Sequence, residues 1–483
     1  MDTNLGKIKN VVVLMLENRS LDWMAGWLYA PSNVSPNGDP YDGLTGSEWC
    51  PDTSGNKVFV SRGTDLTAPL PDPGERFDHI TYQISAGSPD GAMKGFVLDY
   101  ASVIEEYNDD HIIKSDTDPA IMMQCFGPES LPVLSALARN YAICDCWFCS
   151  VPSQTWPNRS FLHAGTSSGM VNNKQARALF STPNNTRTVF NVLQDANVTW
   201  AIYWDHEDVV GPLAWLSQDQ LAGLEDHFFD MDQFLDDAAN GNLPSYTFIE
   251  PRFLLDHNDQ HPGSWFIPPI FADKVSNGEA LISQVYQAVR NSPQWNETML
   301  VVTYDEHGGC YDHVQPPTNA VPPNGPGQEG FDFTRFGVRV PTLVISPYTQ
   351  VGQVFRPPTG QTFDHTSILK TVMELLIPGY NPETDSLTPR DRAAPDLSPA
   401  LQLPDNPGGG LTNPRTDFPG IPDTSELVEA TVDPLALEVP LTDFQKSIVL
   451  AAMRRKMGEA ALLAATPPLV ETVGDALAYL RTL

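Results

Sequence analysis

Three polar clusters in this chain each follow an apolar, strand-like run. They read LENRS at residues 16–20, TWPNR at 155–159 and TYDEHGG at 303–309. A continuous apolar run is typical of a parallel strand covered on both faces, and ligands bind at the carboxyl ends of such strands. We therefore predict an α/β fold with a central, mostly parallel sheet flanked by helices. The three clusters are expected to meet at one edge of that sheet.

Oxygen-bearing side chains dominate these clusters. Glu17, Asn18, Asp305 and Glu306 offer carboxylate and amide oxygens, and Thr155 offers a hydroxyl. Such oxygens bind hard divalent cations, and a cation beside a hydroxyl suits phosphoryl transfer to water. Adjacent residues of a strand point to opposite faces, so both carboxylates after the third strand reach one ion only if the chain turns. The two glycines that follow permit this turn, although such a segment alone is more often a solvated loop.

Thr155 is the candidate nucleophile. The pattern predicts a strand over residues 141–146 and a helix beginning near Trp156, with Pro157 in its first turn. Thr155 then lies at or near the helix N-cap, where unpaired N–H groups and the helix dipole favour an alkoxide and a phosphate. Two alternatives stay open: an ordinary threonine cap, and Ser153 as the nucleophile.

Seven segments together resemble a known family. They run in order from about residue 11 to about 376: VVVLMLENRSLDWMAGWL, DGAMKGF, CDCWFCSVPSQTWPNRSFLHAGT, DHNDQHPG, TYDEHGGCYDHVQPP, FGVRVPTLVISPY and DHTSILKTVMELL. The chain resembles the bacterial phospholipase C and acid phosphatase family of phosphoesterases, within the alkaline phosphatase and sulfatase-like superfamily. The resemblance implies an alkaline phosphatase-like fold. It also implies Glu17, Asn18, Asp305 and Glu306 as metal ligands, and Thr155 as a metal-bound residue that is transiently phosphorylated.

Three histidines are candidates for the catalytic group that faces the phosphate: His79 in RFDHI, His261 in DQHPG and His365 in DHTS. Imidazole titrates near neutral pH, so each is suited to bind a phosphate oxygen or to protonate the leaving alcohol. A structural hydrogen-bonding role is the alternative for each of them. His163 is explained as readily by packing, and His313 by bracing of a loop with Asp312. His307 stands where the family commonly has Asn.

One divalent metal ion is the expected cofactor. Carboxylates, an amide oxygen and a hydroxyl favour Ca²⁺, Mg²⁺ or Mn²⁺ over thiophilic metals. Zinc is the alternative, because alkaline phosphatase relatives hold zinc with histidines and this chain has ten of them.

The chain is strongly acidic, with 60 Asp and Glu against 28 Lys and Arg and a formal net charge of −32. This charge repels nucleic acid and anionic lipid surfaces, so a nucleic-acid partner is excluded. Solubility is the simpler reason for the acidic surface. Attraction of a choline-containing head group, caged by Trp156 and Trp204, is a sharper hypothesis. No apolar stretch approaches the roughly 18 residues of a membrane span, so none is expected.

The amino terminus and the cysteines bear on the compartment. The opening MDTNLGKIKN lacks the basic, apolar and small-residue sections of an export signal. As written the sequence indicates a cytoplasmic protein, although the family it resembles is often exported. The cluster of Cys144, Cys146 and Cys149 lacks the second pair of a closed zinc site, so structural thiols or a disulfide are expected there.

We predict one phosphoesterase core domain over residues 1–400, with a surface excursion at 31–75 that is rich in Pro and Gly. Residues 401–483 are expected to form a linker and a C-terminal helical segment. In that segment, Thr442 with Gln445 forms a possible capping box for one helix, and Thr466 is placed to cap a second.

The function we predict is metal-dependent hydrolysis of a phosphate ester, of the phospholipase C type, through a phospho-threonine intermediate. The partner is a phosphate-ester substrate, with a phospholipid or a choline-containing head group as the candidate. One alternative is an acid phosphatase acting on phosphomonoesters. Another is a catalytically silent relative that binds a cation or a partner. An unmodified threonine argues against the sulfatase branch, whose members use a modified Cys or Ser.

Overall fold

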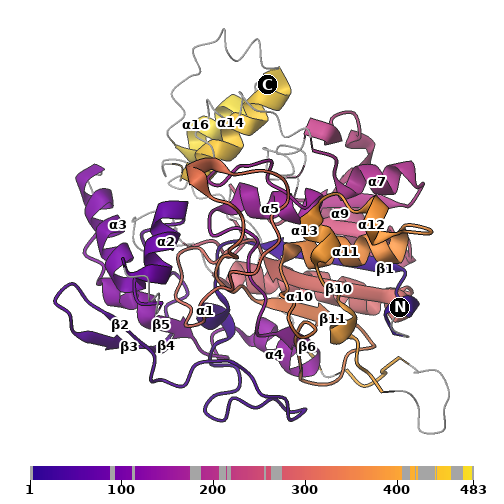
Figure 1. Ribbon diagram of the computed structural model, residues 1–483. Helices are drawn as coiled ribbons and strands as arrows, with labels where there is room; N and C mark the ends of the chain where they lie inside the picture. The colour runs from indigo at the N-terminus through magenta and orange to yellow at the C-terminus, as the bar shows by residue number, and fades with distance from the viewer. Residues whose placement is uncertain are drawn as a thin grey trace.

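The computed structural model describes residues 4–87, 93–110, 115–173, 186–205, 214, 219–254, 257–262, 275–404, 414–418, 420–422, 441, 443–457 and 472–480. Its centre is an eight-stranded sheet in the order β12-β6-β11-β10-β1-β9-β7-β8 (Figure 1). The strands are β1 (Asn10–Leu16), β6 (Ala142–Cys144), β7 (Trp200–Trp204), β8 (Phe228–Asp230), β9 (Tyr246–Ile249), β10 (Thr298–Tyr304), β11 (Thr342–Ile345) and β12 (Gln353–Phe355). All of them run in one direction except β11, which is antiparallel to both of its neighbours. The predicted mostly parallel sheet is confirmed.

The two strands that carry the acidic clusters are neighbours in the middle of the sheet. Every residue of β1 and β10 is buried, as their continuous Val- and Leu-rich runs predict. Their register pairs Leu16 with Tyr304. The two strands therefore end side by side, and the Asp305 N–H donates to the Leu16 carbonyl at 3.1 Å.

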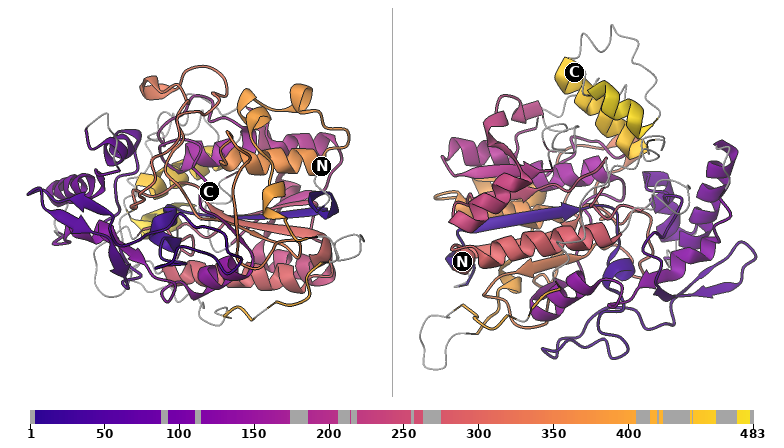
Figure 2. Two further views of the ribbon diagram at one scale, coloured as in Figure 1. Left: turned by 60° about the horizontal axis from the view of Figure 1, so that its bottom comes forward. Right: turned by 180° about the vertical axis from the view of Figure 1, so that it is seen from behind.

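Helices cover both faces of this sheet (Figure 2). On one face lie α4 (Pro132–Asn140) and α10 (Val275–Asn291), and on the other α5 (Thr155–Ala164), α7 (Val189–Asp195) and α11 (His365–Leu376). Further helices are α9 (Met231–Asn240), α12 (Pro382–Asp385) and α13 (Pro389–Ala393). The last two fall within residues 377–404, part of a stretch whose Pro and Gly content suggests a linker or wrapped loop. The domain division at residue 400 stays a prediction.

A separate lobe lies beyond the carboxyl ends of the strands, on the left in Figure 1. It contains β2 (Trp49–Pro51), β3 (Lys57–Phe59), β4 (Ser61–Gly63), α2 (Phe77–Ser85), α3 (Phe96–Asp110) and β5 (Gln124–Phe126), with α1 (Leu21–Ala25) close by. The excursion at 31–75 forms only three-residue strands, as expected from its Pro and Gly content. Its last residues return to the sheet edge.

The C-terminal helices α14 (Asp443–Met457) and α16 (Val473–Leu480) pack on each other, drawn in yellow in Figure 1. The spacing of Phe444, Ile448 and Ala452 predicts a packing face on α14. Ile448 and Ala452 are buried, and the side chain of Phe444 lies outside the described part of the chain. The two expected capping residues, Thr442 and Thr466, lie outside the described residues. No helix in the described part of the chain combines the length and the hydropathy needed to cross a membrane.

Candidate active site

Thr155 and Glu17 meet at the carboxyl edge of the sheet. The Thr155 hydroxyl lies 3.1 Å from Glu17 Oε2, and both side chains are fully buried. Thr155 is the first residue of α5, after the N-cap residue Gln154, which makes no side-chain capping bond. The predicted helix start, with Pro157 in the first turn, is confirmed. The hydroxyl and the carboxylate are thus brought together from segments far apart in the sequence.

Arg159 holds the other oxygen of the same carboxylate. Its Nε and a terminal guanidinium nitrogen lie 2.9 and 2.5 Å from Glu17 Oε1, and that nitrogen also donates to the Met15 carbonyl at 3.1 Å. Nε is also 3.9 Å from Asp305 Oδ2. Sequence reasoning missed this residue. Its position four residues after Thr155, on the same face of the helix, is the signal that points to it.

The chain turns sharply after β10 and gathers the acidic side chains. Asp305 Oδ1 accepts the N–H groups of Asn18 and Glu306 at 3.1 and 2.7 Å. Gly308 has a φ of +61°, and a Cβ there would lie 2.1 Å from the Asn18 carbonyl oxygen. Only glycine fits so close an approach with positive φ. The turn that the two glycines permit is therefore present.

We call Glu17, Asn18, Asp305 and Glu306 the ligand cluster. Among the described residues, Asn18 Oδ1, Asp305 Oδ2 and Glu306 Oε1 are buried oxygens without a hydrogen-bond partner. Buried polar atoms are normally paired, and orphaned oxygens of this kind are the ligands that hard divalent cations take. The donor set therefore fits a divalent metal ion.

Electrostatics favour a cation at the same place. Burial raises the pKa of Glu17 and of Glu306 well above the usual range for a glutamate. Repulsion by Asp305 raises the pKa of Glu17 further, while Arg159 opposes both effects. Repulsion by Glu75 and Asp305 adds to the effect on Glu306. Crowded carboxylates of this kind are stabilised in the ionised form when a cation binds between them.

His365 supports the turn after β10. Its Nε2 lies 2.5 Å from the Asp305 backbone carbonyl oxygen, which only accepts, so Nε2 carries the proton. Its Nδ1 accepts from the Trp147 indole N–H at 3.4 Å, and burial lowers the pKa of the ring. Both ring nitrogens are engaged. This position differs from the phosphate-facing one that the motif DHTS suggested, because α11 packs the ring behind the turn.

His79 lies in a network behind residues 72–75. Its ring nitrogens contact Asp99 at 2.9 Å and Arg76 at 2.8 Å. Burial lowers the pKa of His79, but the bond to Asp99 outweighs it and the net shift is upward. Gln83 joins the same aspartate to the Gly74 carbonyl. These described contacts brace the loop, whereas the sequence predicted contact with phosphate.

His261 and Glu75 lie next to the ligand cluster. His261 Nε2 is 3.4 Å from Glu75 Oε1, and the Asn18 side-chain amide donates to that same carboxylate oxygen. His261 therefore reaches the cluster through Glu75, whereas His365 contacts the backbone of Asp305 directly. Sequence reasoning missed Glu75, which lies in the excursion. Only the return of the chain to the sheet edge places it there.

Comparison with known proteins identifies the family. A sequence profile of the phosphoesterase family matches residues 8–376. This chain belongs to the phosphoesterase family. It is a hydrolase that acts on phosphoric ester bonds.

Relatives of this phosphoesterase occur in plants and bacteria. It is 34% identical over 461 residues to non-specific phospholipase C6 of Arabidopsis thaliana, covering 92% of this chain and 80% of that protein. Identity to non-hemolytic phospholipase C of Burkholderia pseudomallei is 28% over 356 residues, 62% of this chain and 46% of that protein. The family is confirmed, whereas its bacterial branch is not, since identity to the plant protein is higher.

Solved structures resemble this phosphoesterase more distantly. The lipoteichoic acid synthase LtaP from Listeria monocytogenes has a TM-score of 0.37 at 10% identity, over 82% of this chain and 78% of that one. A Vibrio parahaemolyticus protein of the alkaline phosphatase superfamily has a TM-score of 0.33 at 10% identity, over 56% and 64%.

Other residues that the sequence drew attention to lie apart from the ligand cluster. Ser153 donates to Asn172 Oδ1 at 3.0 Å. His163 packs between Phe190 and Phe248, and burial lowers its pKa to about 3, in agreement with a packing role. His313 contacts Asp22 at 2.6 Å, so it braces α1, whereas Asp312 pairs with Arg339.

The tryptophans proposed as a choline cage are not both open. Trp156 is 1% exposed, and its indole N–H donates to Ser447 of α14 at 2.8 Å. Trp204 is half-buried at the end of β7. A cage that requires an open Trp156 face is therefore wrong for this structure, because the C-terminal helix covers that ring.

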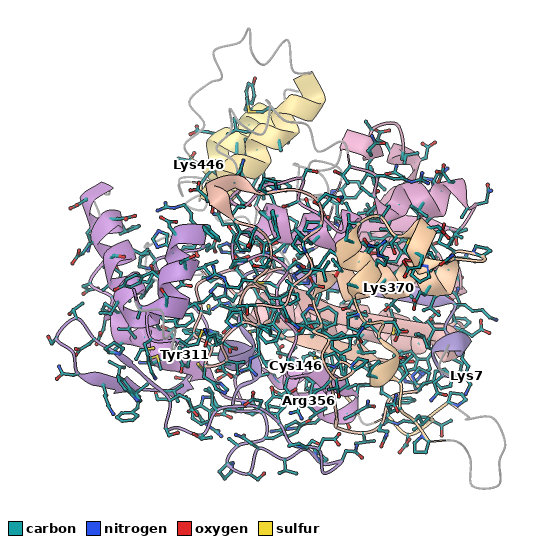
Figure 3. All side chains as sticks on the ribbon, viewed as in Figure 1. Lys7, Cys146, Tyr311, Arg356, Lys370 and Lys446 are labelled. Carbon is teal, nitrogen blue, oxygen red and sulfur yellow. The ribbon has the colours of Figure 1, made fainter. Side chains whose placement is uncertain are left out.

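All six cysteines are free thiols. Within the predicted cluster, the sulfur atoms of Cys144 and Cys146 lie 3.9 Å apart, and Cys146 is labelled in Figure 3. Of the two options that the sequence left open there, structural thiols are confirmed.

Proposed function

We propose that this phosphoesterase is a metal-dependent hydrolase of the phospholipase C type that works through a phosphorylated Thr155. The observation that carries the proposal is the 3.1 Å contact between the Thr155 hydroxyl and Glu17, beside three buried oxygens that lack a hydrogen-bond partner among the described residues. A nucleophile and a set of hard ligands at one point are the parts that such a reaction needs.

Different residues of this chain bind the cation and position the Thr155 hydroxyl for attack. A divalent cation held by the ligand cluster would lower the pKa of the Thr155 hydroxyl and neutralise charge on the phosphate. Glu17 accepts the hydrogen bond of that hydroxyl and orients it, while Arg159 keeps Glu17 in place. The Gly308–Gly309 turn and His365 hold the Asp305 carboxylate toward the same point.

The reaction then proceeds by two displacements. Thr155 Oγ1 loses its proton and forms a bond to phosphorus as the bond to the leaving alcohol breaks, and the alcohol takes up one proton in return. Water next attacks the phospho-threonine, which releases the phosphorylated head group and restores the hydroxyl. Two in-line displacements give net retention at phosphorus. The contact of His261 with Glu75, which in turn accepts from Asn18, supports His261 as the histidine that serves this exchange.

The names of the relatives support a substrate class. Several Arabidopsis thaliana relatives are named non-specific phospholipases C, so we assign a diacyl phospholipid as the substrate of this chain as well. The leaving alcohol is then diacylglycerol. Assays of phosphatidylcholine, a glycerophosphodiester and a simple aryl phosphate under one set of conditions separate this assignment from a phosphomonoesterase.

Acid quenching during turnover tests the intermediate. With a phospholipid substrate we expect a phosphoryl group that still carries the head group on the peptide that contains Thr155, and its loss together with activity in Thr155→Ala. Chelation should abolish turnover, and a divalent cation should restore it. The variant Ser153→Ala should keep both activity and the phosphopeptide. Phosphorylation that persists in Thr155→Ala, or turnover that survives chelation, would contradict the proposal.

A further inference from the structure

The hairpin of β2 and β3 presents a face of aromatic and basic side chains. Its register pairs Trp49 with Phe59 and Pro51 with Lys57, and alternate residues of a strand share a face. These four residues therefore form one face of the hairpin, which we call the hairpin face. We propose that the hairpin face docks on a zwitterionic phospholipid surface. This inference deepens the proposed function, on which it rests for the choice of a lipid as the partner.

The opposite side of the hairpin is packed, which turns the hairpin face outward. Cys50 is fully buried and Val58 packs against the hydrophobic core, while β2 also contacts α3. On the hairpin face, Lys57 is exposed and Phe59 is 52% exposed. Phe59 is the most exposed large apolar side chain in the described part of the chain. A single exposed apolar residue is ordinary, but here the ring is paired with a second aromatic residue on a rigid support.

Two lysines lie against the Trp49 ring of this face. The ammonium nitrogens of Lys57 and Lys94 are each 4.3 Å from the ring centroid, and Lys94 also donates to the Trp49 carbonyl. Neither ammonium forms an ion pair with a described residue, in a chain that has 60 acidic and 28 basic side chains. Burial lowers the pKa of Lys94, and repulsion by Lys57 lowers it further. Two cations that repel each other in this way are stabilised when an anion binds beside them.

This combination of side chains matches the interface of a phospholipid layer. Tryptophan rings lie at the level of the head groups, and apolar rings are buried at the boundary of the acyl chains. Lysine ammonium groups reach lipid phosphates while their stems lie along apolar surface. A zwitterionic surface such as phosphatidylcholine offers these phosphates without a net charge. An anionic surface would repel a chain with a formal net charge of −32.

The turn between the two strands is polar, so the hairpin face and not the tip meets the lipid. Asp52 Oδ1 accepts the N–H groups of Ser54 and Asn56 at 2.8 and 2.7 Å, and the Asn56 amide donates to Asp52 Oδ2 at 3.0 Å. Burial of this carboxylate among acyl chains would be costly. The hairpin therefore lies flat on the surface, with its turn at the level of water and head groups.

The lobe places the hairpin on the side of the molecule where the candidate active site lies. The hairpin belongs to the lobe beyond the carboxyl ends of the strands (Figure 1). The chain that leaves this lobe supplies Glu75, which accepts from Asn18 of the ligand cluster. Thr155 lies at the same carboxyl edge of the sheet. Docking through the hairpin face therefore brings the lipid to the side that carries the proposed nucleophile.

Flotation of the full chain with phosphatidylcholine vesicles tests the proposal. We expect the wild type to bind, and Phe59→Ser and Lys57→Glu each to weaken the affinity about 10-fold or more, because each removes a group that meets the lipid. The matched control is Phe229→Ser, at a phenylalanine of β8 that is 36% exposed, and it should bind as the wild type does. Hydrolysis of a monomeric short-chain phosphatidylcholine should be the same in Phe59→Ser and the wild type, whereas hydrolysis of vesicles should fall.

Hydrogen–deuterium exchange locates the contact and separates the outcomes. We expect vesicles to protect the backbone amides of residues 49–59. A wild type that does not bind the vesicles, or equal binding of the wild type, Phe59→Ser and Lys57→Glu, would overturn the inference. Protection that appears without lipid as the protein concentration rises would assign the face to a second copy of the chain, and would overturn it too. A protein that docks through this face but hydrolyses no lipid contradicts the proposed function and leaves the docking surface intact.

Discussion

Thr155 and Glu17 are separated by 138 positions in the sequence, yet the hydroxyl of the first lies 3.1 Å from a carboxylate oxygen of the second. Arg159, one turn further along α5, holds the other oxygen of that carboxylate. The geometry of the proposed nucleophile therefore depends on how α5 docks on the end of β1. Four further predictions follow from contacts of this kind.

Arg159→Met should destabilise the fold by about 3–5 kcal/mol, because it leaves the buried Glu17 carboxylate without its cation. Urea denaturation measures the loss. The control is Arg62→Met, which breaks the exposed pair with Glu129 and should cost less than about 1 kcal/mol. Equal losses of folding free energy in the two variants would show that the buried pair contributes no more to stability than the exposed pair.

Asn158→Asp should lower kcat about 10–100-fold with little change in KM. The Asn158 amide donates to the carbonyls of residues 151, 153 and 154, just before Thr155. Aspartate keeps the shape but removes these donors, so the loop shifts and the hydroxyl moves with it. Steady-state kinetics should be compared with Asn140→Asp, because the Asn140 amide donates to the Ala136 carbonyl within its own helix. Unchanged kcat in Asn158→Asp would contradict a positioning role.

His365→Phe should weaken metal binding and lower kcat, each about 10–100-fold, as expected for a residue that orients a ligand. The contact that is lost joins His365 to the Asp305 carbonyl. Because both ring nitrogens are engaged in hydrogen bonds, we expect the ring to pass no proton to the substrate, and the limbs of the pH–rate profile should stay where they are. Calorimetric titration with metal and a full pH profile make the test. Disappearance of one limb would instead identify His365 as an acid–base catalyst.

Titration of Glu279 should lower the free energy of unfolding as the pH rises from 4.5 to 7. Burial raises the pKa of Glu279 to about 7 from a usual 4.5, against hydrogen bonds from the N–H groups of Val133 and Leu134. Below pH 4.5 Glu279 is protonated in both the folded and the unfolded chain, so its titration causes no loss of folding stability there. Between the two values the unfolded chain releases it first, and folding stability falls by about 3 kcal/mol in all.

The variant Glu279→Gln removes this titration. Its stability relative to the wild type should therefore rise by about 3 kcal/mol between pH 4.5 and 7.5 in urea denaturation. Glu297→Gln, at an exposed carboxylate paired with Lys9, should give a nearly flat difference over the same range. A flat difference for Glu279→Gln as well would contradict the raised pKa.

Much of the fold was accessible from local pattern. The apolar runs of β1 and β10, each followed at once by acidic residues, predicted both the buried parallel strands and the edge where the ligand cluster lies. Pro157 marked the start of α5. These features are short-range, because side-chain periodicity and backbone restrictions act within a few residues.

Contacts between distant segments were not accessible in that way. The sequence predicted that His79, in the motif RFDHI, faces the phosphate. In the structure, Glu75, four residues earlier, is the residue that contacts Asn18. The sequence suggested an exposed Trp156 ring that could bind a ligand, but α14 covers this ring in the structure. In both cases the deciding partner comes from another part of the chain.

The amino-acid sequence by itself determined which side chains are available at the strand ends, since strand and helix boundaries follow from local hydrophobicity and turn residues. Only the tertiary structure decided which of them meet. The register of β1 on β10, the return of residues 72–75 to the sheet edge and the docking of α11 behind the turn depend on packing between segments that lie far apart in the sequence. Such packing depends on the combined shape of both surfaces, which no single stretch of sequence contains.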